Sequence, residues 1–113
     1  MLKYSFTMLI IVFSGSIFAG CSPLGCTSTV GTIYLHPDGD VKVSVNESID
    51  ETSSLACTLF EGRYFSLKST NTHAEKTYKM LVTAKIEGMN VYFRAIENSA
   101  DCEIWYTTLN SNY

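Results

Sequence analysis

Aromatic and cationic side chains occur at alternate positions in two segments near the C-terminus. Tyr92 and Arg94 alternate with apolar residues in the first segment, and Trp105 lies between aliphatic and aromatic neighbours in the second. Because successive side chains point to opposite faces of a strand, we expect Tyr92, Arg94 and Trp105 on the outer face of a sheet. Exposed Tyr and Trp rings bind sugar rings and apolar partner surfaces. The pattern therefore predicts a ligand-binding face, which takes a glycan or a protein partner.

The residue types that enzymes use for catalysis occur here without the local arrangements that activate them. The two histidines, His36 and His73, are far apart, and neither belongs to a nucleophile or zinc-protease motif. Asp38 and Asp40 flank a glycine, but a calcium loop needs further oxygen ligands at fixed spacing, including a downstream Glu that this sequence lacks. We therefore predict no catalytic residues, no metal site and no cofactor, and the chain is not expected to be an enzyme.

Four cysteines, Cys21, Cys26, Cys57 and Cys102, are available for disulfides. Cys57 and Cys102 both adjoin expected strands, so we predict that they pair and close a loop of about 45 residues. Cys21 then either pairs locally with Cys26 or is itself modified, which would leave Cys26 unpaired. No two of the four have the C-x-x-C spacing of a zinc site.

The first twenty residues have the three regions of a secretory signal. Lys3 supplies a positive charge, an apolar stretch follows over 8–13, and small residues precede Cys21. The apolar stretch is too short for a permanent span, and no later segment has the roughly 20 apolar residues that a span needs. We predict that residues 1–20 are a signal peptide and that the mature protein is exported without a transmembrane span, where disulfides can form.

Residues 17–21, Ile-Phe-Ala-Gly-Cys, allow two kinds of processing. Cleavage after Ala19 or Gly20 would release a secreted or periplasmic protein. The same residues resemble a bacterial lipobox, in which Cys21 becomes the lipidated first residue, although Phe18 stands where lipoboxes usually have Leu. The second alternative would anchor the domain in the bacterial envelope through Cys21.

Composition excludes one class of partner. The chain of 113 residues has 8 Lys and Arg against 11 Asp and Glu, which gives a formal net charge of −3. Proteins that bind nucleic acid use a basic groove or patch, which a mildly acidic chain lacks. We therefore expect no nucleic-acid partner. After the signal, about 93 residues are enough for a single small domain.

Turn residues and alternating apolar residues predict the strands of the first half. A Pro-Asp-Gly sequence within 36–40 predicts a hairpin turn, because Pro restricts φ and Gly accepts positive φ. Valines alternate with Lys42 and Ser44 after this turn, so we expect Lys42 and Ser44 to face solvent. The strands are expected over 30–35, 41–45 and 63–68.

One helix and two further strands are expected in the second half. Thr72 and Glu75 have the spacing of a capping box, and Gly88 can end the helix, which is expected within 69–88. Met80 falls on its polar side. The last strands are expected over 91–96 and 102–109, with Ile104, Tyr106 and Thr108 facing the core. The predicted apolar side of the helix consists of Ala74, Tyr78, Leu81, Val82, Ala84 and Ile86.

The expected order is strand, strand, strand, helix, strand, strand. This is the order of a five-stranded OB barrel, so we predict a mostly β fold with one helix, an α+β domain over 30–113 after a short segment over 21–29. An exported OB-type domain of this size, with a long helix and a disulfide, resembles the receptor-binding B subunits of bacterial A-B toxins. The resemblance rests on element order, helix position and size over 30–109. The resemblance implies that the protein binds a glycan and that it assembles into a homo-oligomer of five subunits.

Two functions follow from these features. The first is an exported bacterial binding module, a toxin-type B subunit that recognises a glycan or a surface protein. The alternative is a monomeric periplasmic or lipid-anchored envelope protein with a structural or inhibitory role toward a partner. The mass of the assembly in solution separates the two, since only the first requires several copies of the chain.

Overall fold

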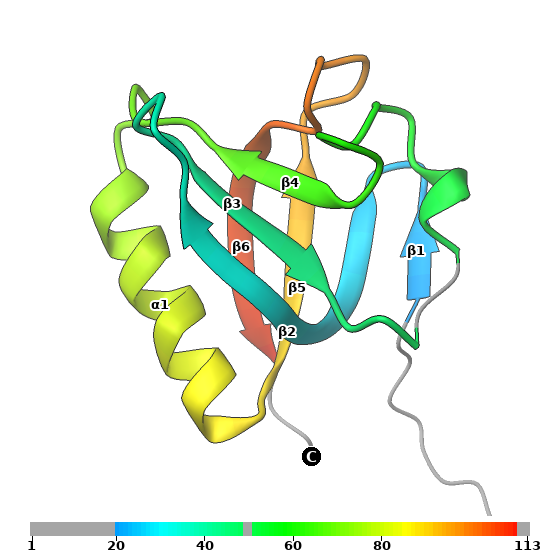
Figure 1. Ribbon diagram of the computed structural model, residues 1–113. Coiled ribbons are helices and arrows are strands. Elements are labelled where there is room, and N and C mark those ends of the chain that lie inside the picture. The colour runs from blue at the N-terminus through cyan, green and yellow to red at the C-terminus, as the bar shows by residue number, and fades with distance from the viewer. Residues whose placement is uncertain (1–19, 49–50, 111–113) are drawn as a thin grey trace, which may run out of the picture.

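One antiparallel sheet and one helix account for most of the fold. The computed structural model describes residues 20–48 and 51–110, and the predicted signal peptide lies outside the described residues apart from Gly20 (Figure 1). The prediction of a mostly β fold with a single α-helix is confirmed for the described residues. The elements are β1 (Gly20–Ser22), β2 (Gly25–Leu35), β3 (Val41–Val45), a 3-10 turn η1 (Thr52–Ser54), β4 (Tyr64–Leu67), α1 (Ala74–Glu87), β5 (Asn90–Ala95) and β6 (Ile104–Asn110).

Strand β2 is shared between the two halves of the sheet. The strand order is β4-β3-β2-β5-β6, and β1 also pairs with β2. The first half of β2 pairs with β5, where Cys26 lies opposite Phe93, and the second half pairs with β3, where Tyr34 lies opposite Lys42. The register shifts between Val30 and Ile33, where the strand bends across the molecule (Figure 1). β2 begins at Gly25, five residues before the start that the sequence pattern predicts, and this added part is the part that pairs with β5.

The two edge strands of this sheet approach each other at one end. Ser66 of β4 forms an isolated parallel bridge with Glu103, and its N–H donates to the Cys102 carbonyl at 3.2 Å. Along their remaining described lengths β4 and β6 are not paired with each other. The sheet of six strands is therefore strongly curved, but it is not closed.

The concave side of the sheet forms the core. Phe65 from β4 and Phe93 from β5 stack with their ring centroids 5.2 Å apart. Leu81 and Ala84 of α1 cover this core from the helix side. Burying a large apolar side chain contributes about 1.5 to 3 kcal/mol, so these contacts hold the two halves of the sheet together. The other fully buried apolar residues include Val43, Leu67, Val91, Cys102 and Ile104.

Helix α1 buries the centre of the predicted apolar side, Leu81 and Ala84, but not its margins. Tyr78 is 41% exposed and Ile86 is 76% exposed, although both were expected on the apolar side. Met80, expected on the polar side, accepts a hydrogen bond at its Sδ from the Thr107 hydroxyl of β6 at 3.2 Å. Met80 is half-buried, so its contact with β6 extends the buried side of the helix beyond the predicted arc.

One of the two predicted end signals of α1 is confirmed, and the other is not. Gly88 has a φ of 69° and ends the helix as predicted, with its N–H directed at the carbonyls of Ala84 and Lys85. The predicted capping box is not formed, because His73 is the N-cap residue and makes no side-chain capping bond. Instead, the Asn71 carboxamide oxygen accepts the His73 N–H at 2.8 Å, so a turn precedes the helix.

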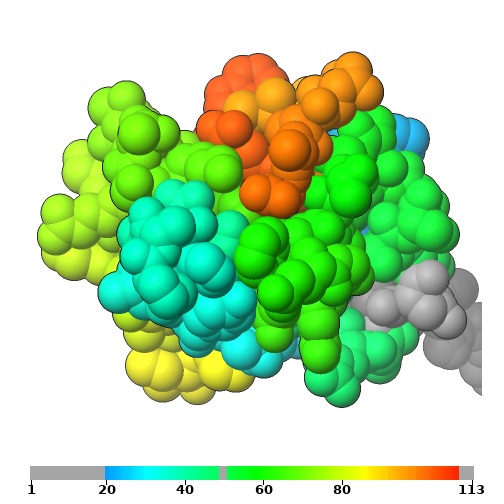
Figure 2. All heavy atoms as spheres, turned by 45° about the horizontal axis from the view of Figure 1, so that its top comes forward, coloured from blue at the N-terminus to red at the C-terminus, as the bar shows by residue number. Residues whose placement is uncertain are grey.

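Two disulfides are formed, one between the paired strands β1 and β2 and one between loops that are distant in sequence. The structure has the predicted Cys57–Cys102 bond, and Cys21 pairs locally with Cys26. Figure 2 shows the loop before β6 (orange) packed against the segment before β4 (green), which are the two segments joined by Cys57 and Cys102. Disulfides suggest an oxidising, exported environment. Over the described ranges, no helix is both long enough and apolar enough to cross a membrane.

Candidate binding face

The outer face of β5 carries the first two predicted site residues. Val91, Phe93 and Ala95 of β5 are buried in the core. Because side chains alternate along a strand, Tyr92 and Arg94 point to the opposite, outer face, as the sequence pattern predicted. In the register with β2, Tyr92 lies opposite Thr27 and Arg94 lies opposite Gly25.

A bulge in β6 places the third predicted residue and adds a fourth. Arg94 pairs with Tyr106, whereas Ala95 pairs with Ile104, so Trp105 is an extra residue between two normal pairs. Trp105 is 56% exposed, which agrees with its predicted outward position. Beyond the bulge, however, the alternation is reversed. Tyr106 and Thr108 were expected to face the core, but they lie opposite Arg94 and Tyr92 on the outer face.

The four side chains form a continuous group, which we call the aromatic face: Tyr92, Arg94, Trp105 and Tyr106. The Arg94 guanidinium carbon lies 5.0 Å from the centroid of the Trp105 ring, and its Nε donates to the Ala95 carbonyl at 3.3 Å. The ring centroids of Trp105 and Tyr106 are 5.6 Å apart, and those of Tyr92 and Tyr106 are 6.5 Å apart. An exposed cation–π pair contributes only about 0.5 to 1 kcal/mol, so it favours the observed orientation of the indole without fixing it.

A shallow hollow of about 400 Å³ adjoins the aromatic face at Tyr92. Its floor is made of small residues from β1 and the start of β2. At Gly25 any side chain would overlap the Phe93 carbonyl of β5, so the close approach of the two strands requires glycine there. The residues around the hollow are Gly20, Cys21, Ser22, Gly25, Thr27, Glu51 and Tyr92.

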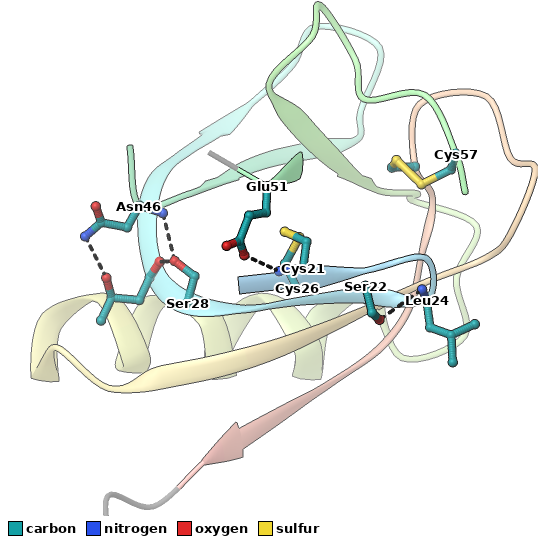
Figure 3. Close-up of a disulfide and its surroundings, with 10 residues drawn as sticks. Cys21, Ser22, Leu24, Cys26, Ser28, Asn46, Glu51 and Cys57 are labelled. Carbon is teal, nitrogen blue, oxygen red and sulfur yellow. Dashed lines mark hydrogen bonds between the residues drawn. A yellow bond between two sulfur atoms is a disulfide. The ribbon is translucent and has the colours of Figure 1, made fainter. Parts of the chain in front are cut away.

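Glu51 forms the wall of this hollow opposite Tyr92. Its Oε1 accepts the backbone N–H of Cys21 at 3.3 Å, which connects the start of η1 to strand β1 (Figure 3). Cys21 is held from its other side by the disulfide to Cys26, the residue directly opposite it in the register. A thioether-linked lipid would require the same Cys21 sulfur. The structure therefore has the disulfide alternative for Cys21, and lipidation is incompatible with that bond.

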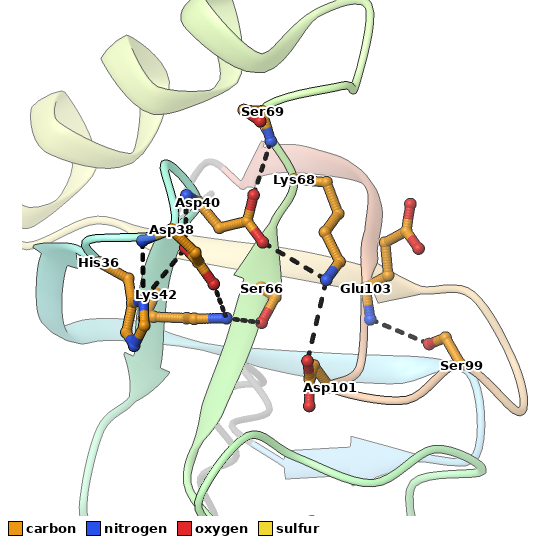
Figure 4. A network of polar contacts seen from close by, with 10 residues as sticks. All are labelled: His36, Asp38, Asp40, Lys42, Ser66, Lys68, Ser69, Ser99, Asp101 and Glu103. Carbon is orange, nitrogen blue, oxygen red and sulfur yellow. Dashed lines mark hydrogen bonds and ion pairs between the residues drawn. The ribbon is translucent and has the colours of Figure 1, made fainter.

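The outer face of the other half of the sheet is covered. Lys42 and Ser44 of β3 were expected to face solvent, but both are buried. The Lys42 ammonium lies 4.0 Å from the centroid of the Phe60 ring and donates to the Ser66 hydroxyl at 2.8 Å (Figure 4). The prediction was wrong because the segment before β4 folds back over this face and brings Phe60 onto it.

The histidine and the two aspartates of the hairpin make the contacts of a turn. The His36 Nδ1 accepts the Asp38 N–H at 3.1 Å, and the Asp38 Oδ1 accepts the Asp40 N–H at 2.8 Å. That backbone N–H, together with the charges of His36 and Lys42, lowers the pKa of Asp38. Asp40 accepts the Ser69 N–H and pairs with Lys68 (Figure 4). Within the described residues, no three His, Cys, Asp or Glu side chains are placed to hold a metal ion.

Comparison of the chain with protein-family models, with curated proteins and with solved structures finds no match. Beyond the three predicted residues, the candidate site contains the small residues of β1 and β2 around the hollow and two large side chains, Tyr106 and Glu51. Strict alternation assigned Tyr106 to the core, and only the bulge reverses it. Glu51 lies in a polar segment without a periodic pattern, so no sequence signal connects it with Tyr92, which is 41 positions further along the chain.

Proposed function

We propose that this chain is an exported binding module whose aromatic face recognises a glycan on a cell surface. The observation that carries the proposal is the position of Trp105, which is 56% exposed and held beneath the Arg94 guanidinium at 5.0 Å. A large indole on a small domain would be expected in the core if it served stability alone. An exposed ring in a favoured orientation is instead ready to stack on a ligand.

The shape and chemistry of this face favour a sugar over a flat protein surface. The rings of Tyr92, Tyr106 and Trp105 follow one another across two strands, which suits the apolar faces of successive sugar rings. The hollow beside Tyr92 adds hydroxyl groups and a carboxylate, which can exchange hydrogen bonds with sugar hydroxyls. A protein partner would instead need a larger apolar centre around these rings.

The strand order supports an OB-like path as part of the proposal. β2, β3, β4, α1, β5 and β6 would correspond to the five strands and helix of that fold, with β1 as an addition. In the OB barrel the third and fifth strands meet in parallel, and the bridge of Ser66 to Glu103 is parallel. The similarity to toxin B subunits, pentameric assembly, the signal peptide and a bacterial source belong to the same proposal. Light scattering of the mature protein would test the assembly, since a pentamer has five times the mass of one chain.

Substituting Trp105 tests the proposed function directly. We expect Trp105→Ala to lower the free energy of unfolding by less than about 1 kcal/mol, whereas a core Trp→Ala change costs about 3 to 5 kcal/mol. The same variant should lose binding on an array of printed glycans. Tyr78→Ala is a matched control, because Tyr78 is 41% exposed on α1 and lies beside Leu35 and Val41, outside the aromatic face.

Two results would contradict the proposal. One is a wild-type protein that binds no glycan on the array. The other is a Trp105→Ala variant that binds the same glycans as wild type with unchanged strength. If the Tyr78→Ala variant lost binding as well as the Trp105→Ala variant, the binding surface would include the helix.

A further inference from the structure

We infer that the amino group left by removal of the signal peptide forms an ion pair with the Glu51 carboxylate in the hollow. This inference rests on the proposed function, because that proposal includes the signal peptide. Cleavage after Ala19 makes Gly20 the first residue, and cleavage after Gly20 makes Cys21 the first residue. Gly20 and Cys21 both line the hollow, so either product places a positive charge there.

The Glu51 carboxylate lies against the backbone of both candidate first residues. Its Oε1 accepts the Cys21 N–H at 3.3 Å, and a side chain at Gly20 would overlap the same oxygen (Figure 3). If Cys21 is the first residue, the nitrogen of this hydrogen bond becomes the ammonium. If Gly20 is the first residue, the ammonium belongs to the residue that Oε1 already contacts. Cleavage therefore adds the attraction of two opposite charges to a contact that the fold already makes.

No other cation of the described chain takes the place of the amino terminus. Within residues 20–48 and 51–110, no Lys or Arg side chain forms an ion pair with Glu51. Arg94, which lies opposite Gly25 on β5, is directed to the Trp105 ring. The other titratable side chain that lines the hollow is the Tyr92 phenol. The Glu51 carboxylate is therefore available to the new ammonium.

The backbone that carries the ammonium is already held in place. The disulfide joins Cys21 to Cys26, and the Leu24 carbonyl accepts the Ala95 N–H of β5 at 3.0 Å. The backbone of Glu51 is fixed at the start of η1, where it is the N-cap residue. Exposed ion pairs usually contribute little, partly because two long side chains must be ordered. Here one partner is the main chain, so only the Glu51 side chain loses conformational freedom.

The ion pair changes what the hollow offers to a ligand. An ammonium has three N–H donors, and a carboxylate has lone pairs on both oxygens. One N–H and one oxygen are enough for the contact between them, which leaves donors and acceptors for sugar hydroxyls. The mature amino terminus is thus a polar group of the candidate site, beside Tyr92, that exists only after the signal peptide has been removed.

Mass spectrometry of the exported protein tests where the mature chain begins. We expect the first residue to be Gly20 or Cys21, with an unmodified amino group. A chain that begins at any other residue, or one whose amino group is acylated, would overturn the inference. The glycan array tests the aromatic face separately, so failure of this inference and failure of glycan binding are distinguishable.

The reactivity of the amino group tests the ion pair itself. An active ester such as acetyl N-hydroxysuccinimide acylates only the uncharged amine, and a neighbouring carboxylate favours the charged form. At pH 7 we therefore expect the terminus of Glu51→Gln to be acetylated about 3-fold faster than that of wild type. Gln keeps an oxygen acceptor and removes only the charge. Glu87→Gln is the matched control and should react like wild type, because it makes the same change at the end of α1, on the opposite side of the molecule from β1 (Figure 1).

An extended chain separates the ion pair from the general effect of charge. Two extra residues before Gly20 move the ammonium about 7 Å along the chain, so Glu51→Gln should no longer change the acetylation rate. Equal rates in wild type and Glu51→Gln at the natural length would overturn the inference. The same acceleration in the extended and the natural chains would also overturn it, because the effect would then not depend on where the chain begins.

Discussion

Each half of the sheet places a cation against an aromatic ring on its outer face, and the two pairs have opposite exposure. Lys42 on β3 lies 4.0 Å from the Phe60 ring and is fully buried. Arg94 on β5 lies 5.0 Å from the Trp105 ring, which is 56% exposed. The two pairs contain the same kind of chemistry at similar distances, so the local interaction does not decide which of them can meet a ligand.

The difference lies in what covers each face. The segment before β4 folds over Lys42, and the Cys57–Cys102 disulfide links that segment to the loop before β6. Ser66 accepts a hydrogen bond from the buried ammonium at 2.8 Å, and the Asp38 carboxylate lies 4.0 Å away. A buried charge needs such partners, so Lys42 acts in stability, whereas the Trp105 ring beside Arg94 stays open to solvent.

Removing the Cys57–Cys102 disulfide should have the largest effect on stability. Replacing Cys57 and Cys102 together by Ser should lower the free energy of unfolding by about 3 to 4 kcal/mol, because the disulfide closes a long loop. Replacing Cys21 and Cys26 together closes a much shorter loop and should cost about 2 kcal/mol. Urea unfolding followed by circular dichroism measures both. Equal losses in the two double variants would show that the Cys57–Cys102 disulfide gives no particular stability to the half of the sheet that contains Lys42.

Truncating the two cations should have unequal effects on stability. Lys42→Ala leaves a cavity under Phe60 and removes the donor to Ser66, so we expect a loss of about 2 to 3 kcal/mol. Arg94→Ala removes a half-buried side chain whose main contact is the cation–π pair with Trp105, and the loss should stay within about 1 kcal/mol. The same urea titrations compare the two variants. If Arg94→Ala destabilised the protein as much as Lys42→Ala, the aromatic face would be a structural element and not a binding site.

Lowering the pH should produce the smallest effect on stability. We expect this effect to arise at Asp38, in the turn between β2 and β3. The Asp40 backbone N–H and the charges of His36 and Lys42 lower the pKa of Asp38 below its ordinary value. A lowered folded-state pKa contributes stability above the unfolded-state pKa, and that contribution is lost as the pH falls below about 4. Melting temperatures measured between pH 7 and pH 2 should therefore fall less steeply at the acid end in Asp38→Asn than in wild type. Parallel curves would exclude Asp38 as a source of the acid sensitivity.

Much of the fold could be predicted because it depends on neighbours along the chain. The Pro-Asp-Gly turn between β2 and β3 places Gly39 at a φ of 97°, and Gly88 ends α1 at a φ of 69°. The order of the elements from β2 to β6 and the outward positions of Tyr92 and Arg94 follow from the same local patterns. Period-2 alternation and turn chemistry act over a few residues, so the sequence by itself determined these features.

The tertiary structure alone decided which of these surfaces are open and how the candidate site is completed. Burial of Lys42 under Phe60, the contact of Met80 in α1 with Thr107 in β6, and the hollow that Glu51 and Tyr92 both line each join residues from separate elements. The bulge at Trp105, which turns Tyr106 outward, is a property of the pairing between β5 and β6 and not of β6 alone. Alternation assigns a side chain to one of two faces, but only the packing of distant segments determines whether that face is covered by protein or open to a ligand.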